Sequence, residues 1–157
     1  MEKRLEKLFF QTTGQSVITA NQLTPAGSNR TYYRLSDADS NTVIGVEGTS
    51  VQENMAFFEI SSHFRKQQLA VPELIAVSDD GLCYLIQDLG DVSLYDYLAS
   101  DRKNGEYSVE SVKMLETVMQ TLPDLQFKGA DGLDFSKCYP DRKSTRLNSS
   151  HQDLSRM

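Results

Sequence analysis

A cluster of turn-forming residues at 25–30 is the first place in this 157-residue chain where residue types and spacing point to chemistry. Gly27 lets backbone N–H groups come close to an anion such as a phosphate, and the side chains of Ser28 and Asn29 add hydrogen-bond donors. Arg30 adds a positive charge. A plain hairpin turn is the alternative, because the same residue types are typical of turns that bind nothing.

The segment 85–90 is the second such place, because it leaves an apolar strand and becomes polar at its end. Backbone groups that leave a strand in this way are available to hydrogen-bond the edge of a planar base. The alternative is an edge strand that ends in a turn. Asp88 and Asp91 are predicted to be solvated or to cap a helix rather than to take part in catalysis.

Groups for acid–base or metal chemistry are scarce. The chain has two histidines, and His63 is expected on the surface of a helix. His151 begins a His-x-Asp match, but the asparagine that should follow would fall at position 158, one beyond the last residue. Asp37 and Asp39 have a spacing seen in metal sites, yet they are predicted to form a turn. No Walker loop, GxGxxG or GxSxG motif is present, so no catalytic or metal-ligating residue is assigned.

Composition excludes several classes of partner. Sixteen basic residues face 22 acidic ones, for a net charge of −6 and no polybasic cluster, which argues against nucleic acid as a partner. No apolar run approaches the ~18 residues that span a bilayer, so no membrane partner is expected and a soluble, cytoplasmic protein is predicted. Cys83 and Cys138 lie far apart without metal-type spacing, which suits a reducing compartment.

Hydrophobic periodicity predicts an α+β fold. Leu5, Leu8 and Phe9 stand at helical spacing and predict a short amphipathic helix that ends near Gly14. Strand-like segments bounded by turn formers follow at 16–24, 30–36, 42–47, 73–78 and 82–88. Their hairpin signals predict a five-stranded antiparallel sheet with one helix packed on it.

Serine-initiated helices occupy the rest of the chain. Ser50 and Glu53 form a capping-box pattern at the start of the helix predicted to pack on the sheet, with Phe57, Ile60 and Phe64 on one face. Glu53 falls on that same face. Two further helices are predicted to start at Ser93 and Ser108. The second of these carries an apolar face, formed by Val112, Leu115, Met119 and Leu122.

This order of elements, with the segments GSNRTYYRL and VPELIAVSDDGLCYLIQDLGD, resembles the N-terminal lobe of the aminoglycoside phosphotransferase and choline kinase superfamily, which has a protein-kinase-like fold. The chain is similar to the bacterial branch that includes kinases of cell-wall amino sugars, over about residues 16–140. The resemblance implies ATP and Mg as cofactors. It also implies transfer of the γ-phosphate of ATP to a hydroxyl of a sugar or amino-sugar-like acceptor.

The resemblance also implies residue roles. The backbone carbonyl of Gln87 and the N–H of Leu89 would bind the adenine edge, with Ile86 behind it. Family kinases use a helix glutamate, here Glu53, to orient a lysine on the third strand. The segment 42–47 holds no lysine, so helix capping is the favoured role of Glu53. Phosphate neutralisation would then fall to one of three groups: Arg30, Arg34, or metal ions held by a second lobe. Gly45 would make room for the nucleotide.

We therefore divide the chain into an N-terminal helix at 1–15, a kinase-like lobe and hinge at 16–90, the start of a second lobe at 91–140, and a tail at 141–157. The tail has no aromatic residue and no apolar periodicity, and RKSTRLNSSH resembles a translated sequencing-library adaptor. It is expected to be non-native or disordered, and the natural chain is expected to continue past Pro140.

A truncated kinase would lack its catalytic loop and metal ligands, so this chain is expected to be inactive alone. The alternative is a non-enzymatic, pseudokinase-like interaction module, for which the missing lysine is the main argument. If the chain were instead a complete small protein, the apolar face of 109–122 would have to be covered, and a homodimer would be expected.

Overall fold

The structure is a computed structural model that describes residues 3–24, 27 and 29–138. Five strands lie within the five predicted segments, and they form one antiparallel sheet in the order β1-β2-β3-β5-β4. Their bounds are β1 Thr19–Gln22, β2 Thr31–Ser36, β3 Thr42–Glu47, β4 Leu74–Val77 and β5 Cys83–Gln87. The predicted α+β class and five-stranded antiparallel sheet are confirmed.

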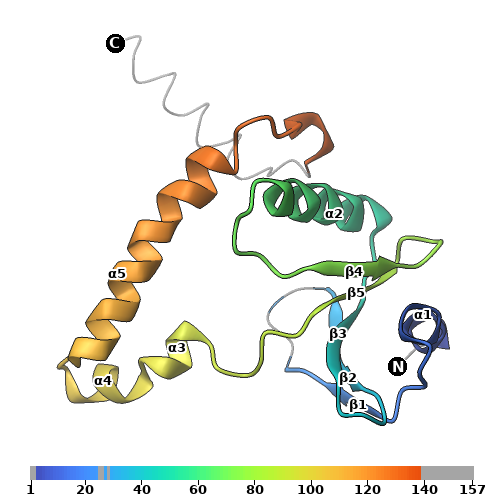
Figure 1. Ribbon diagram of the computed structural model, residues 1–157, viewed down its shortest axis with the longest axis horizontal. Coiled ribbons are helices and arrows are strands. Elements are labelled where there is room, and N and C mark those ends of the chain that lie inside the picture. The colour runs from blue at the N-terminus through green and yellow to red at the C-terminus, as the bar shows by residue number, and fades with distance from the viewer. Residues whose placement is uncertain (1–2, 25–26, 28, 139–157) are drawn as a thin grey trace.

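Helices pack on both faces of this sheet, so the prediction of a single packed helix is wrong. Figure 1 shows α1 (Lys3–Thr13) and α2 (Val51–Lys66) on opposite sides of the strands. One core cluster joins α1 to the sheet, through Leu5, Leu8, Phe9, Leu35, Cys83 and Leu85. The other joins α2 to the opposite face, through Ile44, Val46, Phe58 and Tyr84. Since side chains alternate along a strand, the unbroken apolar runs of β3 and β5 supply both faces at once.

Gly45 serves this packing and makes room for α1. A Cβ atom at this position would lie 2.8 Å from the Leu35 Cδ1 and the Leu5 Cδ2 atoms. The space above Gly45 is therefore filled by the α1 side chains. The expectation that Gly45 leaves room for a nucleotide is wrong, because that face of β3 is the one that α1 covers.

The face of α2 that meets the sheet is displaced by one residue from the predicted one. Asn54, Phe58 and Ser61 are buried at i, i+4 and i+7, whereas Glu53 is only half-buried. Phe57 and Phe58 are neighbours, and either one could mark the centre of the apolar stripe in the sequence. The Ser50 cap is confirmed, since its hydroxyl accepts a hydrogen bond from the Glu53 N–H at 3.3 Å.

The two acidic residues of the β2–β3 turn have a structural role, as predicted. The Asp37 carboxylate accepts hydrogen bonds from the backbone N–H groups of Asp39 and Asn41, both at 2.9 Å. A hydrogen bond from the Asn41 side chain at 3.0 Å, together with these backbone bonds, lowers the pKa of Asp37. Asp37 and Asp39 therefore shape a turn.

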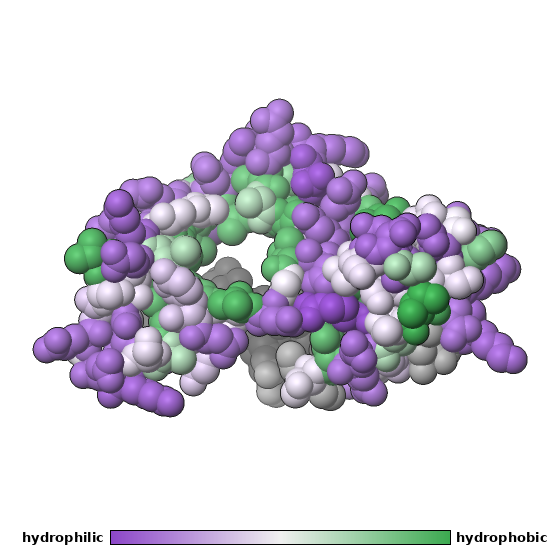
Figure 2. All heavy atoms as spheres, turned by 60° about the horizontal axis from the view of Figure 1, so that its bottom comes forward, coloured by the Kyte–Doolittle hydropathy of each residue, from purple (hydrophilic) through white to green (hydrophobic). Residues whose placement is uncertain are grey.

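The last third of the described chain, from α3 onward, is an arm of helices that stands apart from the sheet (Figure 1). It comprises α3 Leu94–Tyr97, α4 Ala99–Asn104, α5 Val109–Pro123, the π-helix η1 Asp124–Lys128 and the 3-10 helix η2 Phe135–Lys137. The predicted caps Ser93 and Ser108 are confirmed, because each hydroxyl accepts a backbone N–H three residues on. Figure 2 shows a wide opening between this arm and the sheet.

The helical arm leaves apolar side chains exposed. It contacts the sheet unit, by which we mean the five strands with α1 and α2, only near the end of the arm. Along α5, most apolar residues are exposed, among them Val109, Val112, Met114, Met119 and Leu122. The segment after α5 comes back to α2, where Gly129 lies against the ring of Phe64. His63 also belongs to this contact, so its predicted place on a helix surface is wrong. It is half-buried, and its Nε2 atom has no hydrogen-bond partner among the described residues.

Three predictions fall on residues outside the described part: Ser28, the 141–157 tail, and the His151 motif within that tail. Among the residues that the structure describes, no helix has both the length and the apolar character needed to cross a membrane.

Candidate functional site

The loop between β1 and β2 carries the predicted anion-binding residues, and the structure anchors one end of it. Gly27 and Asn29 are exposed. Arg30, at the end of the loop, reaches α2: its Nε donates to the Asn54 Oδ1 at 3.2 Å and its Nη2 donates to the Glu53 carbonyl at 3.2 Å. The guanidinium also lies 5.5 Å from the centre of the Phe57 ring. Arg30 thus fastens the loop to the first turn of α2.

The predicted hinge follows β5 and presents one backbone donor. The Gln87 N–H donates to the Glu73 carbonyl at 2.9 Å, and the Gln87 side-chain oxygen accepts the Glu73 N–H at 3.3 Å. Leu89 lies two residues further on and is 68% exposed. None of the described residues accepts a hydrogen bond from the Leu89 N–H. This donor is therefore available to a ligand at the exit of β5.

An ion pair between β2 and the hinge was missed by the sequence analysis. Arg34 binds Asp88 through two parallel hydrogen bonds, Nε to Oδ2 at 2.6 Å and Nη2 to Oδ1 at 3.0 Å. Its third nitrogen, Nη1, contacts the Asp91 carboxylate. The hydrogen bonds from Arg34 lower the pKa of Asp88, and the same two aspartates raise the pKa of Arg34. The prediction that Asp88 is solvated is wrong, since its side chain is only 7% exposed.

A second missed residue is Asn54, which is completely buried. Its Nδ2 donates to the Gly81 carbonyl at 2.9 Å, while its Oδ1 accepts the Arg30 bond described above. It therefore joins the β1–β2 loop, α2 and the β4–β5 turn. A polar residue four positions before Phe58 is the signal that was available in the sequence, but it indicates burial only once Phe58 is known to face the sheet.

The loop and the hinge lie at opposite ends of the strands. Gln87 pairs with Val43 at one end of β3, and Thr31, next to Arg30, pairs with Glu47 at the other. Val43 and Glu47 are four positions apart on β3, a length of about 13 Å. Along this length the α2 face of the sheet carries half-buried apolar side chains that α2 does not fully cover: Leu23, Tyr32 and Ile86.

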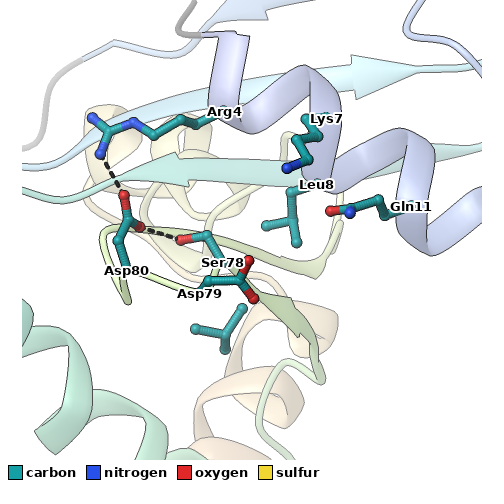
Figure 3. Close-up of a pocket in the computed structure, with 8 residues that line it drawn as sticks. Arg4, Lys7, Leu8, Gln11, Ser78, Asp79 and Asp80 are labelled. Carbon is teal, nitrogen blue, oxygen red and sulfur yellow. Dashed lines mark hydrogen bonds and ion pairs between the residues drawn. The ribbon is translucent and has the colours of Figure 1, made fainter.

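The opposite face carries a separate hollow of about 200 Å³ between α1 and the β4–β5 turn (Figure 3). Arg4 and Asp80 form an ion pair across it at 2.6 Å, and the Ser78 hydroxyl contacts the Asp80 carboxylate at 2.7 Å. Lys7 and Gln11 extend toward the hollow from α1 (Figure 3). The Arg4 and Asp80 side chains are 46% and 40% exposed, so we interpret the hollow as a surface contact between helix and turn.

Asp80 gives a prediction for the dependence of stability on pH. Hydrogen bonds from Ser78, from the Leu82 N–H and from Arg4 lower its pKa from the ordinary 3.8 to about 2. Because the folded form has the lower pKa, this stabilisation is complete above the ordinary value and is lost as the pH falls toward 2. We expect Ser78→Ala to move the pKa back toward 3.8 by more than Arg4→Ala does, since the Arg4 contact is exposed to solvent. Carbon-detected NMR titration of the carboxylate measures both shifts, and equal shifts would contradict the expectation.

The described residues contain no group of three or more histidine, cysteine, aspartate or glutamate side chains placed to hold a metal ion. The acidic residues nearest the hinge, Asp88 and Asp91, are engaged by Arg34. These residues therefore do not make a magnesium site. Comparisons with protein-family models and with curated protein sequences found no match.

Proposed function

We propose that the sheet unit is the nucleotide-binding lobe of an ATP-dependent phosphotransferase that acts on a hydroxyl of a sugar or amino-sugar-like acceptor. The observation that carries the proposal is the Leu89 N–H, an unbonded backbone donor among the described residues, at the end of β5. Adenine is recognised well by such a donor beside an apolar wall, and Ile86 supplies that wall on the α2 face. The acceptor class rests on the family resemblance alone.

The register of the sheet supports an extended ligand. With adenine at Gln87 to Leu89, a nucleoside triphosphate laid along the α2 face would reach the β1–β2 loop about 13 Å away. The exposed Gly27 and Asn29 would then lie near the phosphates. This pose keeps the division expected from the sequence, in which the loop meets the phosphates and the hinge meets the adenine edge.

Arg30 and Arg34 have different charged and polar neighbours, so we expect them to have different roles. Arg34 is neutralised by Asp88 and Asp91, so it does not serve phosphate binding in this arrangement. Arg30 is held by α2 at the loop end, where phosphates would arrive. No magnesium site is formed by the described residues, so we expect no phosphoryl transfer by this chain alone.

The test is a nitrogen–proton NMR titration of the 157-residue chain with ATP and, separately, with tripolyphosphate. We expect weak binding, near a Kd of about 1 mM, which corresponds to only about 4 kcal/mol. ATP should shift the amides of Leu89, Gly90 and Asn29, whereas tripolyphosphate should shift Asn29 alone. The absence of any hinge shift at saturating ATP would overturn the proposal, and so would shifts confined to the arm.

A second candidate function, an interaction module, is favoured by the exposed apolar side chains of α5. A soluble protein rarely leaves such a face uncovered, so a second copy of the chain is its simplest partner here. Light scattering across a concentration series decides this point. A monomer at all concentrations counts against self-association and leaves the nucleotide proposal as the sole candidate.

A further inference from the structure

We propose that Arg34 is a positioning residue, which holds the Asp88 to Asp91 turn in the conformation that presents the Leu89 N–H to an adenine edge. This inference rests on the proposed function. Arg34 itself does not touch the ligand. It acts through Asp88 and Gly90.

Arg34 reaches the hinge across the width of one strand. It lies on β2, and the register places Arg34, Ile44 and Ile86 side by side on the α2 face of β2, β3 and β5. From this face the guanidinium reaches Asp88, which follows β5 directly. A planar fork with two parallel hydrogen bonds fixes both the position and the plane of the carboxylate, which a single contact cannot do.

The fixed carboxylate in turn shapes the hinge. The same Asp88 Oδ1 that accepts the Arg34 Nη2 also accepts the Gly90 N–H at 2.9 Å. Gly90 has φ +86, a left-handed conformation that favours glycine and reverses the chain. Leu89 is thereby held between two fixed residues. Its N–H is placed by a connection that runs from β2 through Arg34 and Asp88 to Gly90.

The two aspartates contribute unequally. The Asp88 side chain is 7% exposed, whereas the Asp91 side chain is 79% exposed. An exposed ion pair contributes little because solvent and salt screen it, while a shielded pair with two hydrogen bonds holds its geometry. We therefore expect the hinge to depend on Asp88 and to tolerate the loss of Asp91.

The first experiment needs no nucleotide. Arg34→Lys keeps the charge but removes the fork, and Arg4→Lys is the matched control, since Arg4 also pairs with an aspartate but on the opposite face. We expect Arg34→Lys to speed solvent exchange of the Gly90 N–H about tenfold, as the loss of one hydrogen bond would. Asp88→Asn should behave like Arg34→Lys, and Asp91→Asn like the wild type. Unchanged Gly90 exchange in Arg34→Lys overturns the positioning role, whatever ATP does.

The second experiment compares ATP with tripolyphosphate. If Arg34 positions the adenine donor, Arg34→Lys lowers the affinity for ATP, read from the Leu89 amide shift, about tenfold. A tenfold change corresponds to one hydrogen bond of about 1.4 kcal/mol. The affinity for tripolyphosphate, read from the Asn29 amide shift, stays unchanged. A merely stabilising ion pair would change both responses together or neither, and that result overturns the proposal. A different failure is possible: Gly90 exchange rises in Arg34→Lys as expected, but the wild-type protein shows no ATP shift. In that case the proposed function and the adenine role of the Leu89 N–H are both wrong, while the effect of Arg34 on the hinge is still supported. The two failures are thereby distinguished.

Discussion

Replacing Phe9 with alanine is expected to lower the free energy of unfolding by about 3–5 kcal/mol. Phe9 is 1% exposed and belongs to the cluster that α1 forms with Leu35, Cys83 and Leu85. The loss has two parts, the transfer free energy of the removed ring and the cavity that remains between α1 and the sheet. A small domain has a total free energy of unfolding of about 5–15 kcal/mol, so this one substitution removes a large part of it.

The neighbouring residue supplies the control for this prediction. Phe10 is on the same helix but 55% exposed, so Phe10→Ala has the same effect on helix propensity and should change stability by less than about 0.5 kcal/mol. Urea denaturation followed by circular dichroism measures both variants. If Phe9→Ala does not fold, Phe9→Leu, with an expected loss of about 1.5 kcal/mol or less, keeps the comparison measurable. Equal losses at the two positions would show that α1 does not pack on the sheet.

The packing of α1 on the sheet also shows what the sequence could and could not predict. The spacing of Leu5, Leu8 and Phe9 predicts that the helix has an apolar face, and the structure confirms that these three side chains are buried. An apolar face carries no information about the surface that will cover it. The signal for that surface lay in β3, where Val43 and Val46 belong to an unbroken apolar run. Such a run is typical of a strand covered on both faces.

Strand pairing was more predictable than helix packing. The hairpin signals in the β2–β3 and β4–β5 turns fix antiparallel neighbours, and the register of each hairpin follows from its turn. The pairing of β3 with β5 places β5 in the interior of the sheet. This pairing does not follow from a hairpin signal, because the chain passes from β3 through α2 to β4 before β5 pairs with β3.

The candidate site was only partly predictable, because its contacts depend on register between distant segments. Arg34 and Asp88 are 54 positions apart. Their contact requires β2, β3 and β5 to lie in the observed order, and a shift of one residue would turn Arg34 to the α1 face. The residue types around Gly27 and Leu89 indicated exposed backbone, which is a local property. The ion pair that organises the hinge is not local, so no spacing rule could have found it.

A second large effect is expected at Asn54, where alanine should cost about 2–4 kcal/mol. The side chain is fully buried and makes hydrogen bonds with Arg30 and with the Gly81 carbonyl. Its removal leaves a guanidinium N–H and a carbonyl without these partners in a site that water reaches poorly, and each unsatisfied group carries a desolvation cost. Gln52→Ala, at an exposed position of the same helix, is the control and should cost less than about 0.5 kcal/mol.

The backbone immediately after β3 offers an independent check on this role of Asn54. A Cβ atom at Gly48 would lie 2.4 Å from the Asn54 Nδ2, so Gly48→Ala must displace the buried amide and break the same hydrogen bonds. In Asn54→Ala the amide is absent and the new methyl group has room. The two substitutions together should therefore cost less than the sum of their separate effects, by about 1 kcal/mol or more, as neighbouring residues with a shared contact do. Strict additivity in a urea-denaturation cycle would mean that Gly48 is required for some other reason, and that Asn54 does not hold the loop, the helix and the turn together.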